Sequence, residues 1–249
     1  MANLKKIWRY FKSHPGLFIL PVFYFFPDLL PAGSFLFIGA IAFDASSTGS
    51  DGVGTTMTWS HTCTGSNRIF FVCAKGNATD TITGVTYATV AMTRIAQLNT
   101  SGSADLSLWY LINPASGAND AVITSSTSTT LRGKASSFTG AKQSGVPDAS
   151  GTQLVTAAAG VSKAITTVAD NCWLVAASAN VSGVNTAGAN TTVRRDGDSA
   201  IMDSNAAQTP AGSYSQAVTF DGNADGGMIV ASFAPLAAAA ANHWLLMGV

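Results

Sequence analysis

An alternating run of oxygen-bearing residues near the C-terminus is the clearest candidate for a binding site. Asp221, Asn223 and Asp225 are separated by single residues, and a glycine follows. Side-chain oxygens spaced in this way open a calcium-binding loop, in which glycine permits the sharp bend. The twelfth position of such a loop needs a bidentate Glu but is Ser232 here. The pattern therefore predicts either a calcium site with an incomplete ligand set or a hairpin turn that follows Phe220.

A second group of charged residues lies about 20 residues earlier in the chain. Arg194, Arg195, Asp196 and Asp198 are close together, and Asp203 follows. Such a group suits an ion-pair patch between subunits or the edge of a ligand site, whereas the ordinary interpretation is a solvated hairpin. We expect the solvated hairpin.

The residue types needed for catalysis are not brought together by any motif in the sequence. There is no G-x-S-x-G segment, phosphate-binding loop, dinucleotide-binding fingerprint or zinc-ligand spacing. Ser60 and His61 are adjacent in a predicted strand, so their side chains point to opposite faces. Every acidic residue is Asp, and paired carboxylates of glycosidases are commonly Glu. The sequence predicts a protein that is not an enzyme.

The three cysteines, Cys63, Cys73 and Cys172, are odd in number and have no metal-binding spacing. We interpret them as small buried apolar residues, with a disulfide as the alternative. If residues 55–75 form a tight hairpin, Cys63 lies opposite Phe70 rather than Cys73.

The composition indicates the kind of fold that positions these residues. Only 10% of the 249 residues are charged, 47% are hydrophobic, and 24 are glycine. Such a chain suits many short strands joined by tight turns. With so little charge, an assembled or surface-bound protein is more expected than a free monomer. No basic stripe crosses the region that follows residue 43, which argues against a nucleic-acid partner.

Residues 55–75 illustrate the predicted elements. Residues 56–61 alternate polar and apolar side chains, Gly65 and Asn67 suit a turn, and residues 69–73 form an apolar run that reads as a strand covered on both faces. Further strands are predicted at 35–45, 84–87, 91–97, 105–112, 121–126, 133–138, 163–168, 172–179, 191–195, 199–203, 214–220 and 228–233. Residues 140–160 read as a surface loop.

The spacing of these strands predicts an all-β fold, a β-sandwich or jelly roll, over residues 39–235. Large apolar side chains on the strands are the expected core: Trp59, Tyr87, Leu108, Tyr110, Phe138, Trp173, Phe220 and Phe233. Trp109 and Tyr110 cannot both face inward from a sheet covered on one side. The exposed one of the two would be a contact for a glycan.

Residues 1–38 form an apolar, proline-punctuated N-terminal arm. Leu4, Ile7, Trp8 and Phe11 share one helical face. The segment is compatible with a cleaved secretory signal, with a membrane anchor, or with an extended arm that packs on a partner subunit. We expect the arm or the membrane segment, with partner contacts through Leu4, Trp8, Phe11, Phe18, Phe23, Phe25 and Phe26. Residues 236–249 form a short apolar, Ala-rich tail.

Several passages resemble β-sandwich modules of phage virion proteins and of secreted bacterial surface proteins. They are residues 41–47 (IAFDASS), 58–62 (TWSHT), 65–68 (GSNR), 85–93 (VTYATVAMT) and 108–114 (LWYLINP). The resemblance spans residues 40–235 and supplies no catalytic residues. It implies a subunit of an assembly, with the arm and tail as additions specific to that role.

These observations predict a non-enzymatic structural protein of an assembled particle. The expected location is a phage virion, as a capsid, decoration or tail component attached through residues 1–38. Its partners would be other copies of itself or other subunits, and it needs no cofactor apart from the calcium considered above. The alternative is an extracellular or cell-surface bacterial module, secreted or tethered to a membrane, that mediates adhesion or binds carbohydrate.

Overall fold

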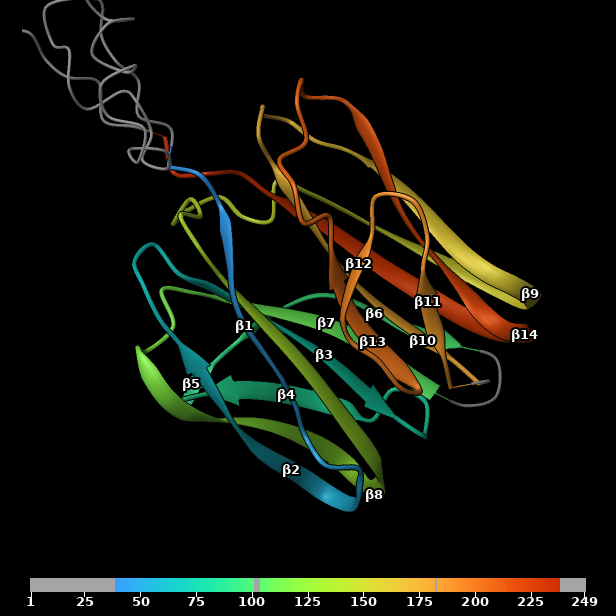
Figure 1. Cartoon of the computed structure of the whole chain (residues 1–249). Coiled ribbons are helices and arrows are strands. Elements are labelled where there is room, and N and C mark those ends of the chain that lie inside the picture. The colour runs from blue at the N-terminus through green and yellow to red at the C-terminus, as the bar shows by residue number, and fades with distance from the viewer. Residues whose placement is uncertain (1–38, 101–103, 182, 238–249) are drawn as a thin grey trace, which may run out of the picture. The chain divides into compact units, whose positions relative to one another are not determined.

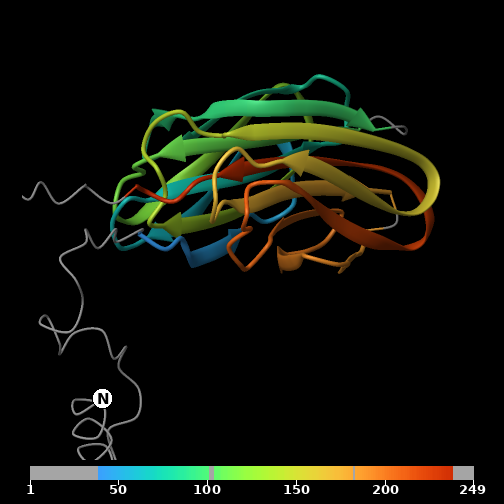
Figure 2. The same cartoon turned by 90° about the horizontal axis from the view of Figure 1, so that it is seen from above.

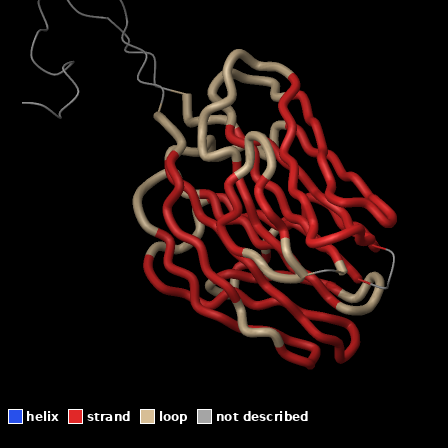
Figure 3. The backbone as a smooth tube through the Cα atoms, turned by 45° about the vertical axis from the view of Figure 1, so that its right-hand side comes forward, coloured by secondary structure: helices blue, strands red, loops and turns tan. Residues whose placement is uncertain are grey.

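The computed structural model describes residues 39–100, 104–181 and 183–237, and these residues form an all-β body (Figures 1 and 3). The predicted fold class is confirmed. The described residues contain no helix that is long and apolar enough to cross a membrane. The strands are β1 (Ala42–Thr48), β2 (Gly52–Cys63), β3 (Ile69–Gly76), β4 (Ile82–Tyr87), β5 (Val90–Ala91), β6 (Thr93–Thr100), β7 (Ala104–Ile112), β8 (Gly117–Thr139), β9 (Ala149–Thr166), β10 (Trp173–Asn180), β11 (Asn185–Ala187), β12 (Thr192–Arg195), β13 (Ser199–Asp203) and β14 (Ser213–Phe233).

The strands build two antiparallel sheets. In the first sheet the order is β5-β4-β8-β3-β7-β6, and β1 and β2 also pair with β8. In the second sheet the order is β11-β14-β10-β13-β12, and β9 also pairs with β14. The first eight strands along the chain therefore form one sheet, and the last six form the other.

The long strands β8 and β14 bend and give each sheet two arms. The register between β2 and β8 breaks between Thr124 and Thr129. The first arm of β8 pairs with β4 and most of β2, and the second arm pairs with β1, β3 and the start of β2. The register between β9 and β14 breaks in the same manner between Thr219 and Ala224. Figure 2 shows β9 and β14 curving together at the right-hand end of the view. Each bend turns one arm back over the sheet.

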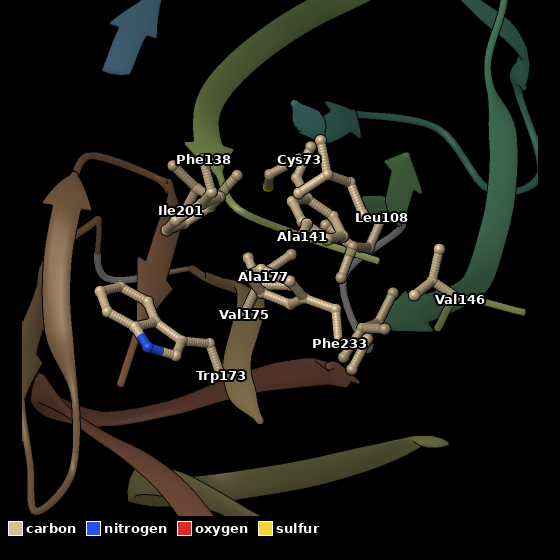
Figure 4. Packing of buried hydrophobic residues seen from close by; sticks show 14 of the residues in the cluster. Cys73, Leu108, Phe138, Ala141, Val146, Trp173, Val175, Ala177, Ile201 and Phe233 are labelled. Atoms are coloured by element: carbon tan, nitrogen blue, oxygen red, sulfur yellow. The ribbon is translucent and has the colours of Figure 1, made fainter. Parts of the chain in front are cut away.

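An apolar cluster lies between the two sheets (Figure 4). Alternate residues of β3 and β7 meet alternate residues of β10 and β14 there, together with Phe138 of β8 and Ile201 of β13. The Phe138 ring centroid is 5.2 Å from that of Phe233 and 5.7 Å from that of Trp173. Because residues of both sheets contribute, this shared core holds the two sheets together.

Each sheet also buries its other face under its own folded arm. In the first sheet, Phe70 of β3 belongs to a second cluster, with Trp59 of β2 and Ile123 of the first arm of β8. In the second sheet, Leu174 of β10 belongs to a cluster with Val218 of the first arm of β14. This double cover explains why every residue of β3 and of β10 is buried, as the sequence predicted for residues 69–73.

The second half of the body, β9–β14, repeats the strand pairing of the first half, β1–β8. The partners of β8 are β1, β2, β3 and β4, and those of β14 are β9, β10 and β11, with β9 spanning the places of β1 and β2. The bulge in β6 between Arg94 and Ala96 recurs in β12 between Val193 and Arg195. Equivalent pairs are Thr48 with Lys134 and Thr152 with Ile229, and Ile69 with Phe138 and Trp173 with Phe233. The body is therefore an internal structural duplication, which the sequence analysis missed.

The predicted hairpin within residues 55–75 is wrong. β2 pairs with β8 and not with β3, and Cys63 lies opposite Gly117 rather than Phe70. β2 and β3 instead face each other across the second cluster, where the Phe70 and His61 ring centroids are 4.6 Å apart. Burial of both apolar faces decided the arrangement, and the short turn between the strands allowed it.

Three further expectations about strands are wrong. Residues 121–126 and 133–138 are not separate strands, because β8 runs through both. Residues 140–160 are not a surface loop, because β9 begins at Ala149 and pairs along β14. Residues 214–220 and 228–233 are not separate strands, because β14 runs through both. In each case small residues that suit turns also fit an extended chain with a strand partner on one side.

The core predictions are confirmed for seven of the eight residues, which are buried: Trp59, Tyr87, Leu108, Phe138, Trp173, Phe220 and Phe233. Tyr110 is half-buried against the cluster between the sheets. The three cysteines are free and buried, as expected. The predicted contacts of residues 1–38, including Leu4, Trp8, Phe11, Phe18, Phe23, Phe25 and Phe26, lie outside the described residues, as does most of the tail.

Candidate functional site

A chain of hydrogen bonds around His61 links β1, β2 and β8. Trp59 Nε1 donates to Ser47 Oγ over 3.0 Å, and Ser47 Oγ lies 2.7 Å from His61 Nδ1. His61 Nε2 lies 3.0 Å from Ser137 Oγ, which donates to Asp44 Oδ2 over 2.7 Å. Because the Ser137 hydroxyl donates its proton to Asp44, its oxygen accepts from His61 Nε2–H. Nδ1 of the neutral ring is then an acceptor and receives a hydrogen bond from the Ser47 hydroxyl. All four bonds then have one direction and end on the Asp44 carboxylate.

The charges of this network follow from burial. Burial lowers the pKa of His61 to about 4, against the smaller opposite effect of Asp44. Burial alone would raise the pKa of Asp44, but hydrogen bonds from Thr64 and Ser137 outweigh it and hold that pKa below its usual value. His61 is therefore neutral and Asp44 is ionised near pH 7.

The order of groups resembles that of a nucleophilic serine with its histidine base, but the geometry favours a structural role. Ser47 pairs directly with Ala135, whose side chain belongs to the second cluster, so the Ser47 hydroxyl faces the interior. A histidine with a pKa near 4 is also a weak base at neutral pH. The network thus stabilises the packing of β1 and β2 against each other and against β8.

The sequence analysis missed Asp44, Ser47 and Ser137. One signal was available, because His61 continues the inward-facing alternation of Met57 and Trp59. A histidine on a buried face requires polar partners for both ring nitrogens. Those partners lie 14 and 76 residues away in the chain, so their identity was not readable from local spacing.

The second charged group joins the two halves of the body. Arg194 donates from Nε and Nη2 to the two carboxylate oxygens of fully buried Asp203, over 2.6 and 3.0 Å. Its guanidinium carbon lies 3.9 Å from the ring centroid of Phe43 on β1. Arg195 Nη2 donates to the Ser46 carbonyl over 2.8 Å. β12 and β13 do form the expected hairpin, and Arg195 is exposed. Arg194 and Arg195 are not merely solvated, however, because both bind other parts of the chain.

Asp198 makes a second polar contact between the halves. Its carboxylate lies 2.7 Å from Arg132 Nη2 and 3.8 Å from Lys75 Nζ, both on strands of the first sheet. Burial lowers the pKa of Lys75, and the attraction of Asp198 partly offsets this effect. The ion pairs at this end of the body supplement the shared apolar core.

The candidate calcium residues lie at the bend of β14, where the strand continues, so the alternative hairpin turn is wrong. Asp221 and Asn223 are exposed, and the Asp225 carboxylate accepts the Ala157 backbone N–H over 2.7 Å. Across the described parts of the chain, no group of three or more His, Cys, Asp or Glu residues is placed to hold a metal ion. One carboxylate oxygen of Asp225 already accepts a hydrogen bond from the backbone of β9. Calcium binding stays a prediction.

The proposed aromatic contact for a glycan rested on an incorrect premise. Trp109 is buried in the second cluster beneath the Arg94 guanidinium, and Tyr110 packs against the cluster between the sheets. Both side chains can be buried or partly buried because both faces of β7 are covered by other strands. The exposed large apolar residues of the described chain are aliphatic: Val53, Val90, Leu154, Val168, Val181 and Val184.

Comparisons with known proteins add no assignment. No family matches the chain, and no curated protein and no solved structure is detectably similar to it.

Proposed function

We propose that the protein is a non-enzymatic structural subunit of an assembled particle, most simply a phage virion, which it joins through residues 1–38. The observation that carries the proposal is the use of the perturbed ionisable groups. His61, Asp203 and Lys75 are all bonded inside the fold, where they connect strands or halves. Their arrangement serves a stable body rather than the chemistry of a substrate.

Sequence features outside the body supply the attachment. An apolar arm of this length could remove on the order of 1,000 Å² of surface from water, which is the size of a specific interface. The low charge of the whole chain, 13 basic and 13 acidic residues in 249, favours close packing of subunits because little charge must be desolvated.

Deletion of residues 2–38 tests the proposal. The shortened chain, expressed in the native source in place of the full chain, should keep the near-ultraviolet circular dichroism of the body but be lost from purified particles. A shortened chain that enters particles at the normal level would contradict attachment through the arm.

The protein purified from its native source distinguishes the proposed function from the alternative one. If the native protein partitions into detergent, or if its mature mass shows cleavage after Ala42, the secreted or membrane-tethered adhesion module replaces the particle subunit. Retention of residues 1–38 in a purified particle supports the proposal.

A further inference from the structure

β9 forms a long edge of the second sheet. It spans 18 residues and pairs with β14, and among the described residues no strand pairs with its other side. A strand edge of this kind presents unpaired N–H and C=O groups that can accept another strand. Natural proteins normally protect such edges with charges, bulges or covering segments.

The open backbone groups can be identified from a side chain. Gln153 Nε2 donates to the Leu154 carbonyl over 2.9 Å, so this carbonyl points away from β14. In an antiparallel pair the outward-pointing residues alternate. The register with β14 is unbroken from Ala149 to Val155, and Ser150 and Thr152 therefore point outward with Leu154.

The equivalent edge in the first half is protected. Ser46 of β1 occupies the place of Ser150, since Ser46 pairs with Ser136 of β8 and Ser150 pairs with Ala231 of β14. Arg195 binds the Ser46 carbonyl. No side chain of the described residues binds the Ser150 carbonyl. The duplication thus leaves one of two matched edges open.

We propose that β9 pairs antiparallel with β9 of a second copy of the chain, with Thr152 opposite the partner's Thr152. Leu154 then lies opposite the partner's Ser150, and the two second sheets become one continuous sheet. The contact uses the same surface of both copies, so it closes as a two-fold dimer. This inference concerns the body and does not depend on the role of residues 1–38.

Charge identifies a second copy as the occupant. Identical edges usually repel each other through their charged side chains. From Ala149 to Ser162, β9 carries no charge, and its one charged residue is Lys163. The segment that pairs in the dimer, residues 149–155, is itself uncharged. β9 bends with β14, so Lys163 folds back over Gly151, where its Cε would lie 2.6 Å from a Cβ built on that glycine, on the face of the sheet opposite to the Thr152 side chain. The Leu154 side chain, 47% exposed, gains a cross-strand neighbour.

A disulfide test uses Thr152→Cys in the full chain. In a hydrogen-bonded antiparallel pair the two Cα atoms are about 5.5 Å apart, which suits a disulfide. Mild oxidation should give a covalent dimer. Thr48→Cys, at the matched position of β1, is the control and should stay monomeric on a non-reducing gel. The native cysteines are buried and contribute little background.

Removal of a backbone donor gives an independent test. Thr152→Pro removes an outward N–H without removing a hydrogen bond to β14, and it should weaken dimerisation about tenfold or more in sedimentation equilibrium. Thr48→Pro is the matched control and should dimerise like the unchanged chain.

Three results would overturn the proposal: an unchanged chain that is monomeric at all concentrations, equal dimerisation of the Thr152→Pro and unchanged chains, or association that is lost only when residues 1–38 are deleted. Association that is lost only when residues 1–38 are deleted would assign it to the arm, which leaves the particle hypothesis standing and removes the β9 contact.

Discussion

His61 should make the fold sensitive to acid between pH 6.5 and 4. Burial lowers the pKa of its imidazole from 6.5 in the unfolded chain to about 4. In that window the unfolded state binds a proton and the folded state does not, so the free energy of unfolding falls as the pH falls. The shift corresponds to about 3 kcal/mol. Urea titrations at a series of pH values measure it.

The matched variant is His61→Gln, which keeps one donor and one acceptor but does not titrate. It should be less stable than the unchanged chain at pH 7, and it should lack this part of the acid dependence. Burial raises the pKa of Asp203 despite Arg194, so protonation of Asp203 acts in the opposite direction. An equal loss of stability in both chains between pH 6.5 and 4 would show that His61 is not the cause.

At the scale of elements, the bends of β8 and β14 decide the architecture. Substitution of Gly160, which lies on β9 beside the bend of β14, tests whether close backbone approach at that bend stabilises the fold. Gly160 of β9 lies opposite Thr219. A Cβ at this position would lie 2.3 Å from the Val218 carbonyl oxygen and 2.9 Å from the Thr219 Cα. Because both are backbone atoms, no rotamer change relieves the overlap. Gly160→Ala should lower the free energy of unfolding by about 2 kcal/mol or more, measured by urea titration.

Gly84→Ala is the control for this prediction. Gly84 lies in β4, and nothing is within 4 Å of a Cβ built there. Its replacement should leave stability unchanged or slightly improved, because alanine restricts the unfolded chain. If the two variants were equally stable, close approach at the bend of β9 would not constrain the fold.

The sequence predicted what each segment is better than what it pairs with. Residues 69–73 were identified as a strand covered on both faces because their apolar run has no polar interruption. The pairing predicted for β2 was wrong. Without long-range information a strand is assigned to the next strand along the chain, here β3, whereas β2 pairs with β8, which starts at Gly117. The end of β9 was predicted as a strand at 163–168, but residues 149–162 were missed because Gly, Ala, Ser and Thr give no alternating pattern in a strand that buries few residues.

The candidate site illustrates the same limit. The alternation around Trp59 places His61 on a buried face, but Asp44 and Ser137 are identified as its partners only once β1, β2 and β8 are in contact. Asp221 and Asn223 show the converse error. Their types and spacing suit a turn, yet the residues on both sides pair with β9, and the turn becomes a bend within one strand.

At the scale of the whole molecule, two halves with matched pairing face each other across one core. Equivalent positions carry different side chains: Ile69 corresponds to Trp173, and Cys73 corresponds to Ala177. Both members of each pair belong to the cluster between the sheets. The two halves thus match in burial and register while these residue identities differ, which explains why the sequence analysis did not detect the duplication.

The shared core should make the two halves unfold together. Phe138 and Phe233 are fully buried, come from different halves, and contact each other and Phe71. Phe138→Ala and Phe233→Ala should each lower the stability of the whole body by about 3–5 kcal/mol. The double variant should lose less than the sum, because the two rings share one contact. Differential scanning calorimetry should show a single transition for the unchanged chain and for both single variants. Two transitions, with each substitution shifting only one of them, would mean that the halves are independent domains and that the contact between them adds little.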